Sequence, residues 1–296
     1  MGNIVMPAVD SGLLLQRTGK LTIILVLICM IFVIKEPVVT KSVIYKFLRG
    51  VSKIQMQWET RNWNEVKGSH FVVRYQPSDR KNAQMVLAVA EKSYVPVSAR
   101  FSYYPSSKTL IIVYPDKASL GHSFGWAADE SAMGVYWAGV IRVLSPNAWV
   151  EEKNPDKVEK IFETDGPIAH EYTHMMVDYI TGGNYTRWFT EGIAQYEEAK
   201  FTGYQMDHRL IKHPDEMYPL ATMDSNFDNL ADQNLAYFES LQAVNYIVEQ
   251  YGEGRLREVL KNLGEGYSMD KSFQKALGFS LDQFEKNFKT WVITKS

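Results

Sequence analysis

Residues 166–183 read GPIAHEYTHMMVDYITGG. The Gly-Pro pair before this stretch and the two glycines after it predict a helix over 167–181, about four turns long. His170 and His174 are four residues apart and share one face of that helix, so both imidazoles can reach one ion. Glu171 lies one step around the helix, beside the position that a metal held in this way leaves open. The pattern therefore predicts a metal site with an adjacent carboxylate.

The chemistry that such a site supports is hydrolysis. Zinc bound by neutral nitrogens and a carboxylate lowers the pKa of its water toward about 7, and Glu171 can take the proton and pass it to a leaving amine. Cys29 is the only cysteine, which excludes a disulfide framework and a zinc site built on several thiolates. The alternative is a helix with two solvent-facing histidines, and the apolar residues 175–177 argue against it.

A second helix is expected from Arg187, in the stretch RWFTEGIAQY at residues 187–196. Together with HEYTH it resembles the gluzincin zinc metallopeptidases, most closely the peptidase-MA-like domains, whose second helix carries a Trp-x-x-Glu-Gly signature. The resemblance implies that His170 and His174 are ligands, that Glu171 is the general base and that Glu191 is the third ligand. One Zn²⁺ per chain would then keep a fourth position for water. A surface carboxylate is the alternative for Glu191.

The resemblance extends weakly over residues 66–291 and implies further roles. It places Gly134, Val135 and Tyr136 on a sheet edge that would bind an extended peptide by backbone pairing. Tyr237 is the candidate stabiliser of the oxyanion, with a packing role as its alternative. Gln195 stands where some gluzincins carry an acid that supports a ligand histidine, and its amide could accept the same hydrogen bond.

Hydrophobic periodicity predicts the α+β class. The expected fold is zincin-like: a small mixed N-terminal sheet with helices, the HExxH helix, and a mainly helical C-terminal half. No repeat or linker divides the chain after residue 60, so residues 61–296 are expected to form one catalytic domain. The individual expectations are strands at 71–75, 109–114, 133–137 and 140–144, helices at 83–101 and 236–251, and a last helix from Ser280.

Residues 21–34 read LTIILVLICMIFVI and hold no charge, which is typical of a membrane-directed segment. Fourteen residues span about 21 Å of a bilayer core about 30 Å thick, so a signal-peptide core and an anchor both remain open. No small-x-small cleavage site follows, and we expect residues 1–40 to be a tail and membrane anchor or an uncleaved signal. Lipidation of Cys29 is a further alternative.

Residues 41–60 are expected to form a basic amphipathic juxtamembrane segment. Apolar residues recur between positions 43 and 54 at helical spacing, with Lys46, Arg49 and Lys53 between them. The apolar stripe of residues 43–58 either lies on anionic lipid or packs on the catalytic domain. We expect a membrane-anchored protein with an extracytoplasmic catalytic domain, although the basic residues after residue 34 conflict with that orientation.

Net charge says little about function, because the 32 basic and 34 acidic residues nearly cancel. No nucleic-acid partner is expected. The sequence thus predicts a membrane-tethered, zinc-dependent peptidase acting on peptide or protein substrates. The alternatives are a non-catalytic zinc domain that recognises a peptide or partner, and a metal-free structural module. Substrate preference and oligomeric state are left open.

Overall fold

The computed structural model of the chain describes residues 37–124, 132–152, 154–203 and 209–295. The predicted membrane segment at residues 21–34 lies outside this described part. Within it, no helix combines the length and the apolar character needed to span a bilayer.

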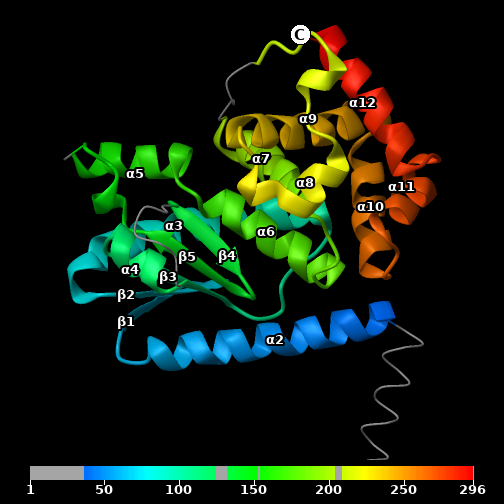
Figure 1. Cartoon of the computed structure of the whole chain (residues 1–296). Helices are drawn as coiled ribbons and strands as arrows, with labels where there is room; N and C mark the ends of the chain where they lie inside the picture. Colours follow the sequence, from blue (N-terminus) through cyan, green and yellow to red (C-terminus); the bar gives the residue numbers. More distant parts are fainter. Residues whose placement is uncertain (1–36, 125–131, 153, 204–208, 296) are drawn as a thin grey trace, which may run out of the picture.

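A mixed sheet forms the N-terminal layer (Figure 1). Its order in the described chain is β1-β2-β3-β5-β4, with parallel pairing in the centre and an antiparallel strand at each edge. The four predicted strands are confirmed, and the hairpin partner β4 lies at an edge. The strands are β1 (Asn64–Lys67), β2 (Phe71–Tyr75), β3 (Thr109–Tyr114), β4 (Gly134–Trp137) and β5 (Val140–Leu144).

Alternate residues of the buried strands serve two separate cores, as the period of a strand requires. Ile111 and Val113 face the main core beneath α3 (Arg80–Phe101) and α6 (Ile168–Thr181). Leu110 and Ile112 face a smaller core on the opposite side. That smaller core is closed by α4 (Lys117–His122) and by Met56 of α2 (Pro37–Glu59).

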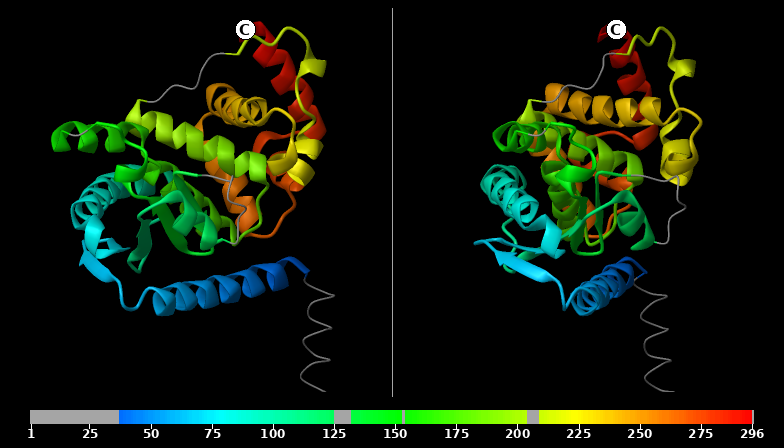
Figure 2. Two further views of the ribbon diagram at one scale, coloured as in Figure 1. Left: turned by 60° about the vertical axis from the view of Figure 1, so that its left-hand side comes forward. Right: turned by 90° about the vertical axis from the view of Figure 1, so that its left-hand side faces the viewer.

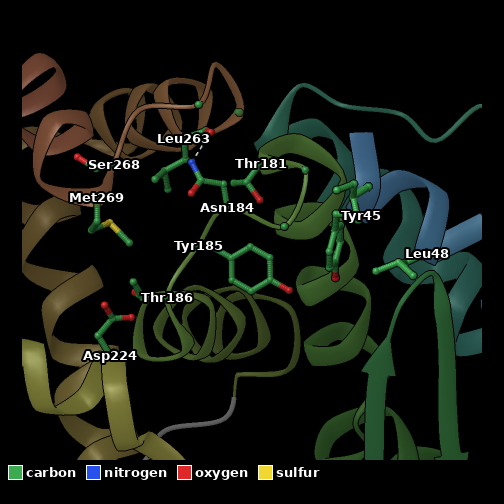
Figure 3. Close-up of a pocket in the computed structure, with 15 residues that line it drawn as sticks. Tyr45, Leu48, Thr181, Asn184, Tyr185, Thr186, Asp224, Leu263, Ser268 and Met269 are labelled. Carbon is green, nitrogen blue, oxygen red and sulfur yellow. Dashed lines mark hydrogen bonds between the residues drawn. The ribbon is translucent and has the colours of Figure 1, made fainter. Parts of the chain in front are cut away.

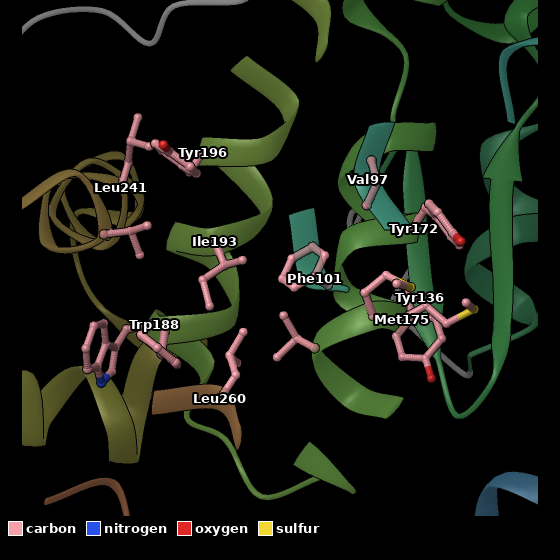
Figure 4. Close-up of a cluster of buried hydrophobic side chains, with 14 of the residues drawn as sticks. Val97, Phe101, Tyr136, Tyr172, Met175, Trp188, Ile193, Tyr196, Leu241 and Leu260 are labelled. Atoms are coloured by element: carbon pink, nitrogen blue, oxygen red, sulfur yellow. The ribbon is translucent and has the colours of Figure 1, made fainter. Parts of the chain in front are cut away.

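The rest of the described chain is mainly helical and packs around the HExxH helix α6, so the predicted α+β class is confirmed. Trp188, Phe189, Phe273 and Phe284 form an aromatic cluster in the core of this helical part. Figure 4 shows Trp188 among other buried side chains of the main core. The further helices are α5 (Pro155–Asp165), α7 (Arg187–Thr202), α8 (Leu220–Asn226), α9 (Gln233–Tyr251), α10 (Glu253–Gly264), α11 (Met269–Leu277) and α12 (Leu281–Lys295).

Helix starts are where the sequence prediction was least accurate. Helix α9 begins at Gln233 rather than 236, because the Asp232 side chain caps it by accepting the N–H of Leu235 at 2.9 Å. Helix α3 begins at Arg80 rather than 83, directly after a 3₁₀ turn. The last helix, predicted from Ser280, begins at Leu281, and the Ser280 hydroxyl caps it by accepting the N–H of Gln283 at 3.2 Å.

Gly192 brings α7 and α9 into close contact. A Cβ atom at this position would lie 2.1 Å from the carbonyl oxygen of Ser240, which is backbone and cannot turn away. We expect Gly192→Ala to lower the free energy of unfolding by about 1–3 kcal/mol through overpacking. Chemical denaturation measures the loss. Gly254→Ala, in open surroundings on α10, is the matched control and should leave stability unchanged or slightly higher.

Helix α2 runs along the outside of the domain in all three views (Figure 1, Figure 2). It is attached through Arg49, whose Nη1 lies 3.0 Å from Oδ2 of Asp178 and whose guanidinium lies over the ring of Tyr179. The alternative in which the apolar stripe of residues 43–58 packs on the catalytic domain is wrong. Phe47 and Ile54 of that stripe are 69% and 66% exposed, because the opposite face of α2 makes the contact.

Candidate metal centre

Two helices bring the predicted ligands together. His170 and His174 lie on α6, and Glu191 lies on α7, which packs against it. The three side chains each offer a ligand atom, and these atoms lie within 4.8 Å of one another. Nε2 of His170 is 3.3 Å from Oε2 of Glu191, and Nε2 of His174 is 3.5 Å from Oε1.

These distances fit a zinc ion. Ligand atoms about 2.0–2.1 Å from a tetrahedral centre stand about 3.3–3.4 Å apart, close to both histidine-to-carboxylate separations. The two separations end on different oxygens of Glu191, so both oxygens face the site. The donor set, two imidazole nitrogens and one carboxylate, is also one that zinc prefers at catalytic sites. The three residues would therefore hold the metal and leave one position open.

Each ligand histidine is oriented through its other ring nitrogen. Nδ1 of His170 lies 3.0 Å from Oε2 of Glu198, and Nδ1 of His174 lies 2.7 Å from the Thr190 hydroxyl. With Nδ1 donating to these oxygens, both Nε2 atoms are free to bind a metal. The Glu198 carboxylate accepts and so fixes the tautomer of His170, whereas the Thr190 hydroxyl can donate or accept and fixes only the direction of the His174 ring.

The prediction that Gln195 supports a ligand histidine is wrong. Its amide nitrogen donates to the carbonyl oxygens of Glu191 and Tyr237, so it bridges α7 to α9 instead of supporting a ligand histidine. Glu198 takes that role. It is seven residues after Glu191, two helical turns on, and so lies on the same face of α7. The spacing is a signal that sequence reasoning passed over.

Substitution of Glu198 tests this orientation. We expect Glu198→Gln to lower zinc affinity about 10–100-fold, the usual effect of losing an outer partner of a metal-bound histidine. Competition with a chelating dye at fixed pH measures the change. The neighbouring buried Glu197 pairs with Arg100 and touches neither histidine, so Glu197→Gln is the matched control and should keep the affinity of the unsubstituted protein. Equal affinities in all three proteins would contradict the assignment.

The Glu171 side chain is buried beside the ligands, and its Oε2 accepts the backbone N–H of Tyr136 at 2.5 Å. Burial raises the pKa of this carboxyl. A carboxylate with a raised pKa is a better proton acceptor, since general-base efficiency rises as the pKa approaches the working pH.

Arg187 is a cation at the site, and of the two readings its sequence position allows, pairing with a substrate carboxylate or an ordinary salt bridge, the structure shows the salt bridge. Its Nη1 lies 2.6 Å from Oε1 of Glu191, and its Nε lies 3.2 Å from Oδ1 of Asp228. Burial alone would raise the pKa of Glu191. The two histidines and the Arg187 guanidinium outweigh burial and hold the pKa of this carboxyl well below its usual range, so Glu191 is charged at neutral pH.

A cleft of about 1620 Å³ opens at these residues. Tyr237 of α9 lines it, and burial and the charge of Glu191 raise the pKa of the Tyr237 hydroxyl. The phenol is therefore protonated at neutral pH and can donate a hydrogen bond. Its ring also contacts Phe227 edge to face, which is the packing role that the sequence left open.

Strand β4 lines the same cleft with Gly134, Val135 and Tyr136. A Cβ atom at Gly134 would lie 2.7 Å from Cβ of Pro167, so glycine lets the strand approach α6. The Tyr136 side chain turns into the core (Figure 4), where its hydroxyl donates to Oδ2 of Asp178. Only the backbone of Tyr136 can therefore meet a ligand, and its N–H is held by Glu171.

Comparison with known proteins places the chain in a family. The sequence profile of the Peptidase MA superfamily matches residues 134–294, more than half of the chain. The chain therefore belongs to the Peptidase MA superfamily. It is also similar to the uncharacterized protein YhcO of Bacillus subtilis (strain 168), with 25% identity in an alignment 235 positions long that covers 71% of this chain and 69% of that protein.

Comparison with solved structures finds zinc metallopeptidases of low overall similarity. An M1 zinc metallopeptidase from Deinococcus radiodurans has 13% identity and a TM-score of 0.37, over 79% of this chain and 51% of that one. A two-domain M1 zinc metallopeptidase mutant bound to L-arginine has 14% identity and a TM-score of 0.38, over 77% and 50%. The chain thus spans about half the length of these structures.

Proposed function

We propose that the protein is a zinc-dependent peptidase of the gluzincin type. One observation carries this proposal: the Nε2 atoms of His170 and His174 converge on the carboxylate of Glu191 while Glu171 lies beside them at a cleft. Membership of the Peptidase MA superfamily supports it.

In this proposal each residue has a distinct task. When bound, zinc lowers the pKa of its water to about 7 and polarises the peptide carbonyl. Glu171 accepts the proton of the attacking water and delivers it to the leaving amine. The Tyr237 hydroxyl donates a hydrogen bond to the carbonyl oxygen as negative charge develops there.

The substrate would be a peptide or protein segment in extended form. As an edge strand, β4 turns the backbone groups of Gly134 away from β5, where they can pair with such a segment along the cleft, whereas those of Val135 face β5. We assign residues 61–296 to the catalytic domain, with α2 packed against it. We also propose that residues 1–40 anchor the protein in a membrane, with the catalytic domain on the extracytoplasmic side.

Metal analysis combined with peptide hydrolysis tests the proposed function. The purified full-length protein should contain one equivalent of zinc and cleave members of a peptide mixture, as detected by mass spectrometry. A chelator should abolish cleavage and added zinc should restore it. Zinc without cleavage of any peptide would favour a non-catalytic recognition domain. Absence of zinc, with stability unaffected by chelation, would favour a metal-free module.

A second assay tests whether the protein is anchored in a membrane and on which side the catalytic domain lies. Alkaline extraction of membranes should leave the full-length protein in the pellet, and a protease added to intact cells should degrade the catalytic domain. Release by alkali would argue against the anchor. Protection from the protease until the cells are opened would place the domain on the cytoplasmic side.

A further inference from the structure

Helix α2 carries an unusual concentration of exposed apolar side chains. Of the thirteen large hydrophobic residues that lie exposed in the described part of the chain, seven are on this one helix. Their exposed fractions run from 44% to 69%. These seven residues, here called the outer stripe, are Val43, Ile44, Phe47, Leu48, Val51, Ile54 and Trp58.

The outer stripe lies opposite the face that holds α2 to the domain. The contacts to the domain come from Tyr45, Arg49 and Met56, which recur at helical spacing on the other side. Arg49 is anchored to Asp178, and Met56 is buried in the smaller core. Because these contacts fix the rotation of the helix, the outer stripe is held facing away from the domain.

Ile44 and Leu48, at one edge of the outer stripe, line a second cavity of about 620 Å³. Figure 3 shows Tyr45 and Leu48 of α2 on one side of this cavity and Met269 on the other. Ile44 and Leu48 therefore face a cavity, and the domain does not cover them.

Charge and chain continuity identify what covers the outer stripe. Between residues 37 and 58 the helix has no acidic residue, and the exposed Lys46 lies along one border of the stripe, whereas Lys53 donates to the carbonyl oxygen of Lys108 in the domain. Long basic side chains in that position can reach anionic headgroups while apolar side chains enter the acyl region. The uncharged run at residues 21–34 ends only two residues before the helix begins.

We propose that the outer stripe of α2 lies in the surface of an anionic lipid bilayer. The helix also lines the catalytic cleft with Ser52, Gln55 and Glu59, which border the stripe on its other side. The cleft consequently opens next to the bilayer. This consequence rests on the proposed peptidase function and names its substrate class: polypeptide segments that lie close to a membrane surface.

Site-directed fluorescence tests the lipid contact without relying on activity. Cys29→Ser removes the only cysteine, and Ile54→Cys then takes an environment-sensitive label in the full-length protein. In vesicles of phosphatidylcholine and phosphatidylglycerol, the label at position 54 should shift to shorter wavelength and be quenched by brominated lipid. The control label at Lys261→Cys, on an exposed position of α10, should show neither change.

Two outcomes would overturn the proposal. The first is a label at position 54 that brominated lipid does not quench. The second is a spectral shift that occurs without lipid and grows with protein concentration, which would show that a second copy of the chain covers the outer stripe.

A second assay tests the substrate class. The double variant Phe47→Glu and Ile54→Glu should cleave a soluble peptide like the unsubstituted protein but cleave the same peptide several-fold more slowly when a lipid tether holds it on vesicles. Equal loss on both peptides, or on neither, would contradict this consequence. If the unsubstituted protein cleaves neither peptide, the proposed function fails, and the fluorescence result still decides the lipid contact.

Discussion

Replacement of Glu171 by glutamine is expected to lower kcat about 10²–10⁴-fold while zinc stays bound. The expectation follows from the position of Glu171 beside the three ligand residues and outside their set. Glutamine keeps the shape of the side chain, and its carbonyl oxygen can still accept the N–H of Tyr136, which now lies 2.5 Å from Oε2. What the variant loses is the ability to take a proton.

Zinc content and hydrolysis must be measured on the same preparation of this variant. Emission spectroscopy should give one zinc per chain for both proteins, and the melting temperatures should agree within a few degrees. Hydrolysis by the variant at the unsubstituted rate would remove Glu171 from the mechanism. Loss of zinc would instead mean that the carboxylate holds the metal.

Replacement of Glu191 by glutamine is expected to act on the metal itself. The substitution removes the one charged ligand, so zinc affinity should fall by more than the roughly 100-fold that bounds the loss of an outer partner. It also leaves Arg187 without the carboxylate oxygen that lies 2.6 Å away. Dialysis against a chelating buffer, followed by metal analysis, should find zinc in the unsubstituted protein and none in the variant.

Thermal unfolding provides a second measurement on the same pair of proteins. Zinc that binds only the folded state stabilises it by about 4 kcal/mol when present at a thousand times its dissociation constant. A chelator should therefore lower the melting temperature of the unsubstituted protein and leave that of the variant unchanged. Equal responses of the two proteins would show that Glu191 is not a ligand.

Short-range patterns explain why much of the site could be predicted. His170 and His174 were paired through helical spacing alone, and Glu191 followed from a motif on the next helix. Arg49 and Asp178, by contrast, are 129 residues apart and no pattern connects them. Likewise, periodicity groups the apolar residues of α2 on one face but cannot say whether that face or the opposite one meets the domain.

Glu198 was missed for a different reason. The family resemblance directed attention to position 195, one turn after the third ligand, whereas the carboxylate that holds His170 is two turns after it. The resemblance thus correctly predicted a side chain that supports a histidine, but placed it at position 195 instead of 198. Four strands were predicted because each is a short apolar run bounded by turn residues, whereas β1 was missed because its sequence, NEVK, is mostly polar. The start of α9 was less accurate because a side-chain cap decides it.

The ion pair between Arg49 and Asp178 changes where the folded unit begins. Asp178 is fully buried and lies one helical turn after His174, one of the proposed ligands. If the chain were shortened to start at residue 61, this carboxylate would lose its cation, and removal of one partner of a buried pair costs about 3–5 kcal/mol. We infer that the smallest autonomous unit of this protein includes α2. Helix α2 is then part of the scaffold that keeps α6 in place. Removing α2 would weaken the positioning of His170 and His174 although it contacts neither of them.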